Sequence, residues 1–239
     1  WKGELEDDGF NRLILGAGLE GRSVSILRAF AKYDRQIGGP FSQSYIEGTF
    51  ARYPEIAQLL INLFIQRFDP KSKSSESAKE KAQAKLLDTI DSSLDKVANL
   101  DDDRTIRRFV EMITATIRTN YFQVDESQAS KPYISFKIIP EKISEMPQPV
   151  PKFEIFVYSP QVEGVHLRGG KVARGGLRWS DRREDFRTEV LGLVKAQQVK
   201  NSVIVPVGAK GGFVCKQLPD NGSRQEIFEA GKACYRTVD

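Results

Sequence analysis

The sequence has little of what builds disulfides, metal sites or membrane spans. Its 239 residues include two cysteines, Cys215 and Cys234, and one histidine, His166. Two thiols do not make a disulfide framework, and one histidine without a close cysteine pair does not make a zinc site. No apolar run approaches the ~20 residues that cross a bilayer. The sequence therefore predicts no metal, no membrane span and a reducing, cytoplasmic compartment.

The N-terminus also lacks an initiator Met and the basic and apolar regions of a signal peptide. We therefore expect the chain to be part of a longer protein. With 40% hydrophobic and 28% charged residues, the composition is that of a globular protein and excludes a disordered tail.

Positive charge is concentrated in one segment. The net charge is only +4, but residues 165–216 hold eleven Lys or Arg and four acidic residues. A local cationic excess attracts anions, which can be nucleic acid, phosphate or carboxylate groups.

The first half of the sequence has helical periodicity. Ser23 is a candidate N-cap for a helix that runs to Arg35, and Pro54 fits the first position of the next helix. A long helix is expected at 77–98, and another follows three aspartates at 101–103 and continues to Ile117. Two long helices joined by a short turn predict an antiparallel hairpin.

The pattern changes near residue 125. Alternating or continuous apolar residues predict strands at 134–138, 153–158, 164–168 and 202–205, a glycine-rich turn at 208–212, and helices at 184–200 and 224–236. We therefore predict an α/β protein (α+β overall). Its expected parts are a helical region at 1–125 and a mixed-sheet α/β domain at 126–239 that is incomplete at its C-terminus.

One glycine motif is interpreted as a decoy. Gly16 to Gly21 has the form G-x-G-x-x-G, which in dinucleotide-binding folds joins a strand to a helix at the pyrophosphate. Such a unit needs a second strand ending in an acidic residue, and here the helix runs instead into Gly38-Gly39-Pro40. We therefore expect no nucleotide site at this motif.

Two other loops combine glycines with cations. Gly208-Ala-Lys210-Gly-Gly212 is expected at the carboxyl end of a strand, where open α/β sheets place ligands. A lysine near other cations gives up its proton more readily and can act as a base or polarise a carbonyl. Arg174-Gly175-Gly176-Leu177-Arg178 offers guanidinium forks for a carboxylate. The alternative for the first loop is a solvated lysine without a function, and the alternative for the second is a basic hairpin tip.

The stretch VEGVHLRGGKVARGGLRWSDRREDFRTEVLGLVKAQQVKNSVIVPVGAKGGFVCK (162–216) closely resembles the large bacterial NAD-specific glutamate dehydrogenases. FEIFVYSP (153–160) and FSQSYIEGTFARYPEIAQLLINLFIQRFDP (41–70) match that family too. More distantly, 162–216 is similar to the substrate domain of the small hexameric glutamate dehydrogenases. That likeness implies Lys210 as the catalytic lysine and these substrate-binding residues: Arg174, Gly175, Gly176, Arg178, Lys200, Gly208 and Gly211.

The resemblance also implies a reaction. L-glutamate would be oxidatively deaminated to 2-oxoglutarate and ammonia, with a hydride passing to NAD, in a protein that forms a homo-oligomer. The family's NAD domain and a catalytic aspartate would lie outside these residues, so we expect this chain alone to be inactive and to contribute no cofactor-binding residue. Arg174 stands where the small enzymes have a lysine, and Val207 where they have a glycine.

An alternative hypothesis is that the basic segment 165–216 forms a non-catalytic module that binds anions, RNA or another protein. Binding through many phosphates would fall steeply with added salt. The segment has few aromatic residues interleaved with its cations, which argues against RNA. His166 is interpreted as a packed strand residue and Cys215 as a small buried hydrophobe.

Overall fold

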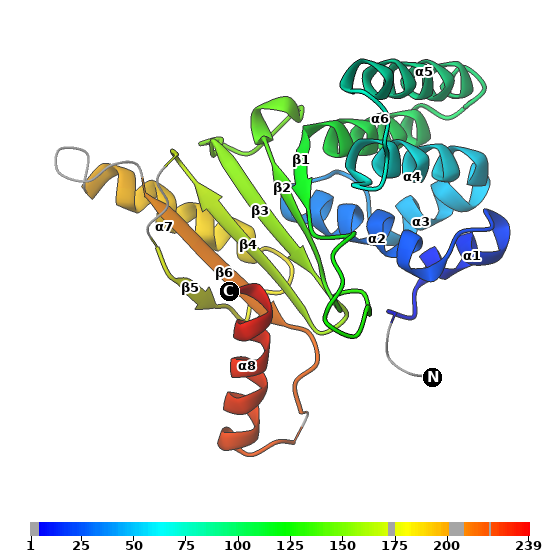
Figure 1. The fold of residues 1–239 in the computed structure, drawn as a ribbon. Helices are drawn as coiled ribbons and strands as arrows, with labels where there is room; N and C mark the ends of the chain where they lie inside the picture. Colours follow the sequence, from blue (N-terminus) through cyan, green and yellow to red (C-terminus); the bar gives the residue numbers. More distant parts are fainter. Residues whose placement is uncertain (1–4, 172–174, 201–207, 220) are drawn as a thin grey trace.

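The computed structural model describes residues 5–171, 175–200, 208–219 and 221–239, and the side chains of 198–200 are not described. A six-stranded sheet lies at the centre, with a layer of helices from the first half of the chain on one side (Figure 1). Two helices from the second half pack on the sheet, one on each face. The α/β fold expected from the sequence is therefore confirmed.

Six α-helices precede the sheet, and their boundaries follow local capping signals. They are α1 (Arg12–Gly16), α2 (Gly21–Gln36), α3 (Gln43–Arg52), α4 (Pro54–Phe68), α5 (Glu76–Leu94) and α6 (Leu100–Ala115). Pro54 begins α4 as predicted, and the side chains of Ser42, Ser75 and Asn99 cap the helices that follow them.

Three details of the helical layer differ from the prediction. Helix α2 begins two residues before Ser23, after Glu20, and Ser23 is buried against Tyr121 instead. Helix α6 ends at Ala115, whose carbonyl accepts a hydrogen bond from the backbone N–H of Ile139, the residue that follows the strand at 134–138. Ile117 therefore lies in a strand. Helices α5 and α6 follow one another as expected, but α5 packs mainly on α4.

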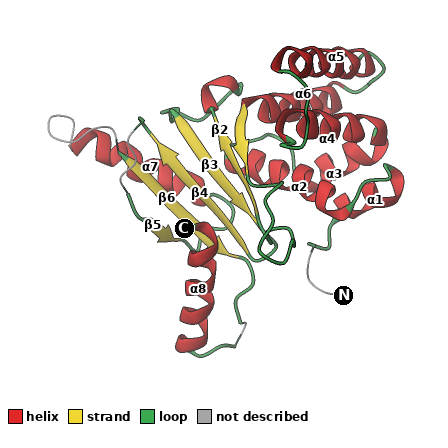
Figure 2. Ribbon diagram, in the orientation of Figure 1, coloured by secondary structure: helices red, strands yellow, loops and turns green. Residues whose placement is uncertain are grey.

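The strands form one mixed sheet (Figure 2). They are β1 (Thr116–Thr119), β2 (Ile134–Ile138), β3 (Phe153–Tyr158), β4 (Val162–Arg168), β5 (Leu177–Trp179) and β6 (Ala209–Cys215). The order across the sheet is β1-β2-β3-β4-β6-β5, and the neighbouring strands pair antiparallel except for the parallel pair β5–β6. The strands at 134–138 and 153–158 lie where the sequence predicts them.

The glycine-rich turn predicted at 208–212 is wrong, because residues 209–215 form strand β6. The glycines allow close packing rather than a change of direction. A Cβ on Gly212 would come within 2.6 Å of Val190, and one on Gly211 would clash with Leu177. The strand predicted at 202–205 lies outside the described residues.

Two helices accompany the later strands. Helix α7 (Phe186–Lys200) packs on β6 and β4 from the face that also carries α2, and α8 (Arg224–Val238) packs on β6 and β4 from the other face. A capping box between Ser223 and Glu226 begins α8.

The main hydrophobic core runs through both halves of the chain. The ring of Phe30 in α2 stacks on that of Phe136 in β2, with 4.3 Å between their centres. Phe64 of α4 meets the same ring edge-on. The helical layer and the sheet therefore share buried surface, and the boundary proposed near residue 125 stays a prediction.

Candidate functional site

Lys210 lies on the face of the sheet that helix α7 covers. It is the second residue of β6 and pairs with Leu167 of β4, and paired residues of antiparallel strands share a face. Leu167 is fully buried in the main core, on the α2 and α7 side. Lys210 itself is half-buried and lies at the edge of the core. Half-buried lysines pack the aliphatic part of the side chain on apolar neighbours.

The last turn of α7 lies beside the start of β6. A Cβ on Gly208 would clash with the side chain of Gln197, which belongs to that turn. Lys200 is the final residue of the same helix. The backbone thus brings the Lys200 position to the strand end that carries Lys210. The side chain of Lys200 and the whole of Arg174 lie outside the described residues, and the sequence leaves open whether they converge on Lys210.

Arg178 of β5 lies on the same face of the sheet as Lys210. Its partner in the parallel ladder with β6, Gly212, is two residues beyond Lys210. The Arg178 Nε is 3.0 Å from a carboxylate oxygen of Glu189 in α7, and Ser180 donates a hydrogen bond of 2.6 Å to the same carboxylate. Glu189 therefore holds Arg178 in place and offsets part of its charge.

Gly175 and Gly176 pack their backbone on β6. A Cβ on Gly175 would collide with the carbonyl oxygen of Ala209, and the Gly211 N–H donates to the Gly176 carbonyl at 3.3 Å. Both glycines also line a cavity of about 340 Å³ on the α8 side, together with His166. The described members of the predicted site thus lie beside β6, but they are divided between the two faces of the sheet.

His166 lies on the face opposite to Lys210, where it pairs with Gly211. Burial, and to a smaller extent the charge of Arg168, lowers the pKa of His166. A neutral ring at pH 7 fits the expectation of a packed strand residue. The thiols of Cys215 and Cys234 lie together in a small apolar cluster between β6 and α8. The neighbouring Cys234 and burial raise the pKa of Cys215, which keeps this thiol protonated.

An anchor for α7, not foreseen from the sequence, is a fully buried ion pair. Arg187 donates from Nε and Nη2 to the two carboxylate oxygens of Glu154 in β3, at 2.6 and 2.8 Å, and both side chains are 0% exposed. The Gln36 amide donates to the Arg183 and Glu184 carbonyls and accepts from the Arg187 N–H. A sequence signal existed, because Glu154 interrupts an apolar strand.

The glycine motif at 16–21 and the potential metal ligands were two further candidates for a site. The glycines at 16–21 lie between helices α1 and α2, so the strand that a dinucleotide site requires before them is replaced by a helix. Residues 5–171, 175–200, 208–219 and 221–239 contain no group of three or more His, Cys, Asp or Glu side chains arranged to hold a metal. Across these ranges, no helix combines the length and apolarity of a membrane span.

The fold and the grouped cations define an α/β domain with a candidate site for a small anion. Residues 89–238 match the family described as bacterial NAD-glutamate dehydrogenase, catalytic domain, and residues 5–70 match glutamate dehydrogenase, helical motif 3. The chain therefore belongs to the bacterial NAD-glutamate dehydrogenase family.

Three curated relatives carry the name NAD-specific glutamate dehydrogenase. The chain is 57% identical to the protein of Pseudomonas aeruginosa over 98% of its length, 55% to that of Halomonas elongata over 99%, and 50% to that of Mycobacterium tuberculosis over 99%. It spans only 14 to 15% of the length of these relatives.

Proposed function

We propose that this chain forms the helical support and part of the substrate-binding region of an NAD-dependent glutamate dehydrogenase. The reaction would convert L-glutamate, NAD⁺ and water to 2-oxoglutarate, ammonium, NADH and a proton. NAD, held by another part of the protein, would accept the hydride. The names of the relatives support this reaction, and they lend no support to the alternative of an RNA- or protein-binding module.

The proposed roles follow from charge and position. Glutamate carries two carboxylates, and cations on one sheet face can hold them by charge-assisted hydrogen bonds. Lys200 and the guanidiniums of Arg174 and Arg178 are assigned to the carboxylates. Lys210 is assigned to the carbon that reacts, where its ammonium group polarises the developing carbonyl of 2-oxoglutarate.

One observation carries this proposal. Lys210 and Arg178 share the α7 face of neighbouring strands, and the last turn of α7, which ends at Lys200, lies against the start of the same strand. The protein would be a cytoplasmic homo-oligomer, as the resemblance implies. The helical region at 1–125 would act as the scaffold for the α/β domain at 126–239.

The test is the substitution Lys210→Ala in the full-length protein, with Lys195→Ala as the control. Lys195 is an exposed lysine of α7 that lies outside the assigned set. We expect Lys210→Ala to lower kcat by roughly 10²–10⁴-fold, the range for loss of a positioned proton-transfer or polarising group. Lys195→Ala should keep kcat within about twofold. Equal turnover by the two variants would contradict the role of Lys210.

A further inference from the structure

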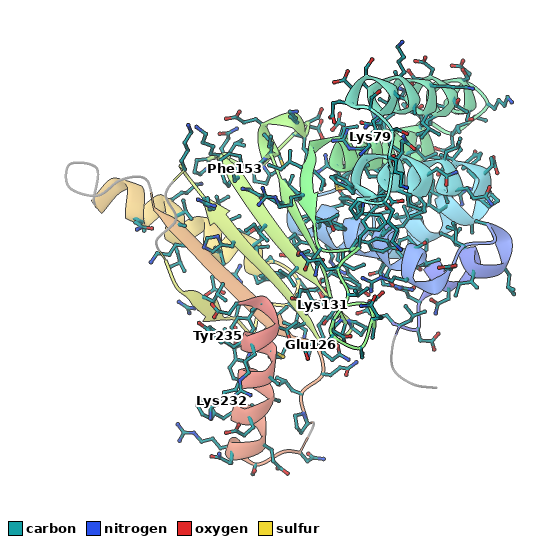
Figure 3. All side chains as sticks on the ribbon, viewed as in Figure 1. Lys79, Glu126, Lys131, Phe153, Lys232 and Tyr235 are labelled. Carbon is teal, nitrogen blue, oxygen red and sulfur yellow. The ribbon has the colours of Figure 1, made fainter. Side chains whose placement is uncertain are left out.

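A second cavity lies at the end of the sheet away from Lys210. It has a volume of about 640 Å³ and is bordered by the start of α2, the segment that leads into β2, and the turn between β3 and β4. Figure 3 labels Lys131 at this end of the sheet, and Phe153, which pairs with Arg168 near Lys210, at the other end. Four strand residues, or ~13 Å, separate Tyr158 from the level of Lys210.

The described residues that line this cavity include two cations and no carboxylate. They are Leu5, Gly21, Arg22, Ser25, Ser130, Lys131, Pro132, Tyr133, Ile134, Tyr158, Ser159, Pro160 and Gln161. Within the described part of the chain, neither Arg22 nor Lys131 takes part in an ion pair. The cavity therefore carries a positive charge that no described residue of its lining neutralises.

Arg22 is held rigidly at the edge of the cavity. Its Nη1 donates to the Lys131 carbonyl at 2.9 Å, its Nη2 donates to the Tyr121 carbonyl at 2.8 Å, and its guanidinium lies over the Tyr121 ring. These two bonds use only part of a fork that has five N–H donors. The remaining donors are pre-positioned, which reduces the entropy lost when they bind an oxyanion.

The start of α2 adds further donors. The side chain of Glu20, at the N-cap, makes no capping hydrogen bond, and the first turn of this 16-residue helix contains no acidic residue. The first backbone N–H groups of a helix are unpaired within it and favour a negative charge. Gly21, the first residue of the helix, lines the cavity.

Tyr158 supplies an independent sign of a missing partner. Tyr158 is among the residues that border the cavity and is only 2% exposed, yet its hydroxyl has no hydrogen-bond partner among the described residues. Buried tyrosine hydroxyls are usually paired. Burial raises the pKa of Tyr158, so the hydroxyl stays protonated and can donate. The acids nearest to it are already in ion pairs with cations: Glu6 with Lys32 and Lys216, Asp8 with Arg28, and Glu163 with Lys216.

We propose that this cavity is a binding site for a small metabolite with a terminal phosphate or carboxylate group, separate from the glutamate site. The oxyanion is held by Arg22, Lys131, the N-terminus of α2 and the hydroxyl of Tyr158. The volume admits a ligand well beyond a single ion. This site does not depend on the function proposed for Lys210.

The test measures anion binding to the full-length protein by calorimetry. The probes are inorganic phosphate, glycerol 3-phosphate and propionate, with chloride at matched ionic strength as the reference. If phosphate and glycerol 3-phosphate bind more tightly than propionate, the cavity is a phosphate site. If propionate binds more tightly, it is a carboxylate site. No binding beyond that of chloride by any probe overturns the proposal.

Two variants locate the binding. Tyr158→Phe removes a hydroxyl that has no partner in the described structure, so folding should be unaffected, and Lys131→Gln removes one charge. Each should raise the Kd of the bound probe about fivefold or more, whereas Lys79→Gln on α5 should leave it unchanged. Equal Kd values in wild type, Tyr158→Phe and Lys131→Gln would overturn the site. Lys210→Ala should retain this binding, which separates the outcome from that of the catalytic proposal.

Discussion

At Gly175, the backbone touches β6 so closely that no other residue fits. A Cβ there would collide with the Ala209 carbonyl, one residue before Lys210, whereas a Cβ on Gly176 has nothing within 4 Å. The two adjacent glycines therefore make a matched pair for testing how the approach to Lys210 is set.

We expect Gly175→Ala to displace this segment from β6, at a cost of about 1–3 kcal/mol for forced overpacking. Glutamate KM should rise because the start of the strand moves. Gly176→Ala should change both quantities little. Thermal unfolding and steady-state kinetics of the two full-length variants would check this, and similar losses in both would show that the close approach is unimportant.

For individual residues, the sequence shows where a glycine or a charged side chain stands, but it does not show which neighbours that residue packs against. Gly211 and Gly212 were expected in a turn, because glycine favours turns when nothing is known of its neighbours, but they lie in strand β6. Only the packing of Leu177 and Val190 shows why Gly211 and Gly212 belong to a strand. The pair Arg187–Glu154 was missed because its partners are 33 residues apart.

Helix α7 is the element on which the proposed site depends. Its first turn is fixed by Glu154 of β3 and by Gln36 of α2, and the same turn holds Arg178 through Glu189. Its last turn lies beside the start of β6. The charged anchor is fully desolvated, which makes it costly to break from one side.

Glu154→Gln should therefore lower the free energy of unfolding by about 3–5 kcal/mol, since it leaves the Arg187 guanidinium buried without its counter-charge. Replacing both residues, Glu154→Leu with Arg187→Met, should recover much of this loss. Arg107→Ala, which breaks exposed ion pairs with Asp91 and Asp103, should cost under ~1 kcal/mol. Denaturant titration would compare them, and a Glu154→Gln cost as small as that of Arg107→Ala would contradict the anchor.

At the scale of elements, periodicity predicted most helices and strands, and the errors have local causes. Ile117 continues the apolar stripe of α6, but Thr116 and Ile117 are both β-branched and also suit a strand, and the pairing of this segment with β2 decides for the strand. Strand β5 is three residues long and has no alternating pattern of apolar residues, so periodicity does not indicate it.

For the whole molecule, the helical layer and the sheet form one packed body around Phe30, Phe64 and Phe136. The described part of this body has a cationic site but no strand before the glycines at 16–21. We therefore expect these 239 residues alone to produce no NADH from glutamate and NAD, whereas the full-length protein does. Glutamate-dependent formation of NADH by the isolated chain, measured by absorbance, would contradict this prediction.

The most direct measurement is a structure of the full-length protein with 2-oxoglutarate bound. We expect the ligand on the α7 face of β5 and β6, with the Lys210 Nζ within hydrogen-bond distance, roughly 2.7–3.2 Å, of the keto or carboxylate oxygens. A ligand bound elsewhere, with Lys210 directed into solvent, would contradict it.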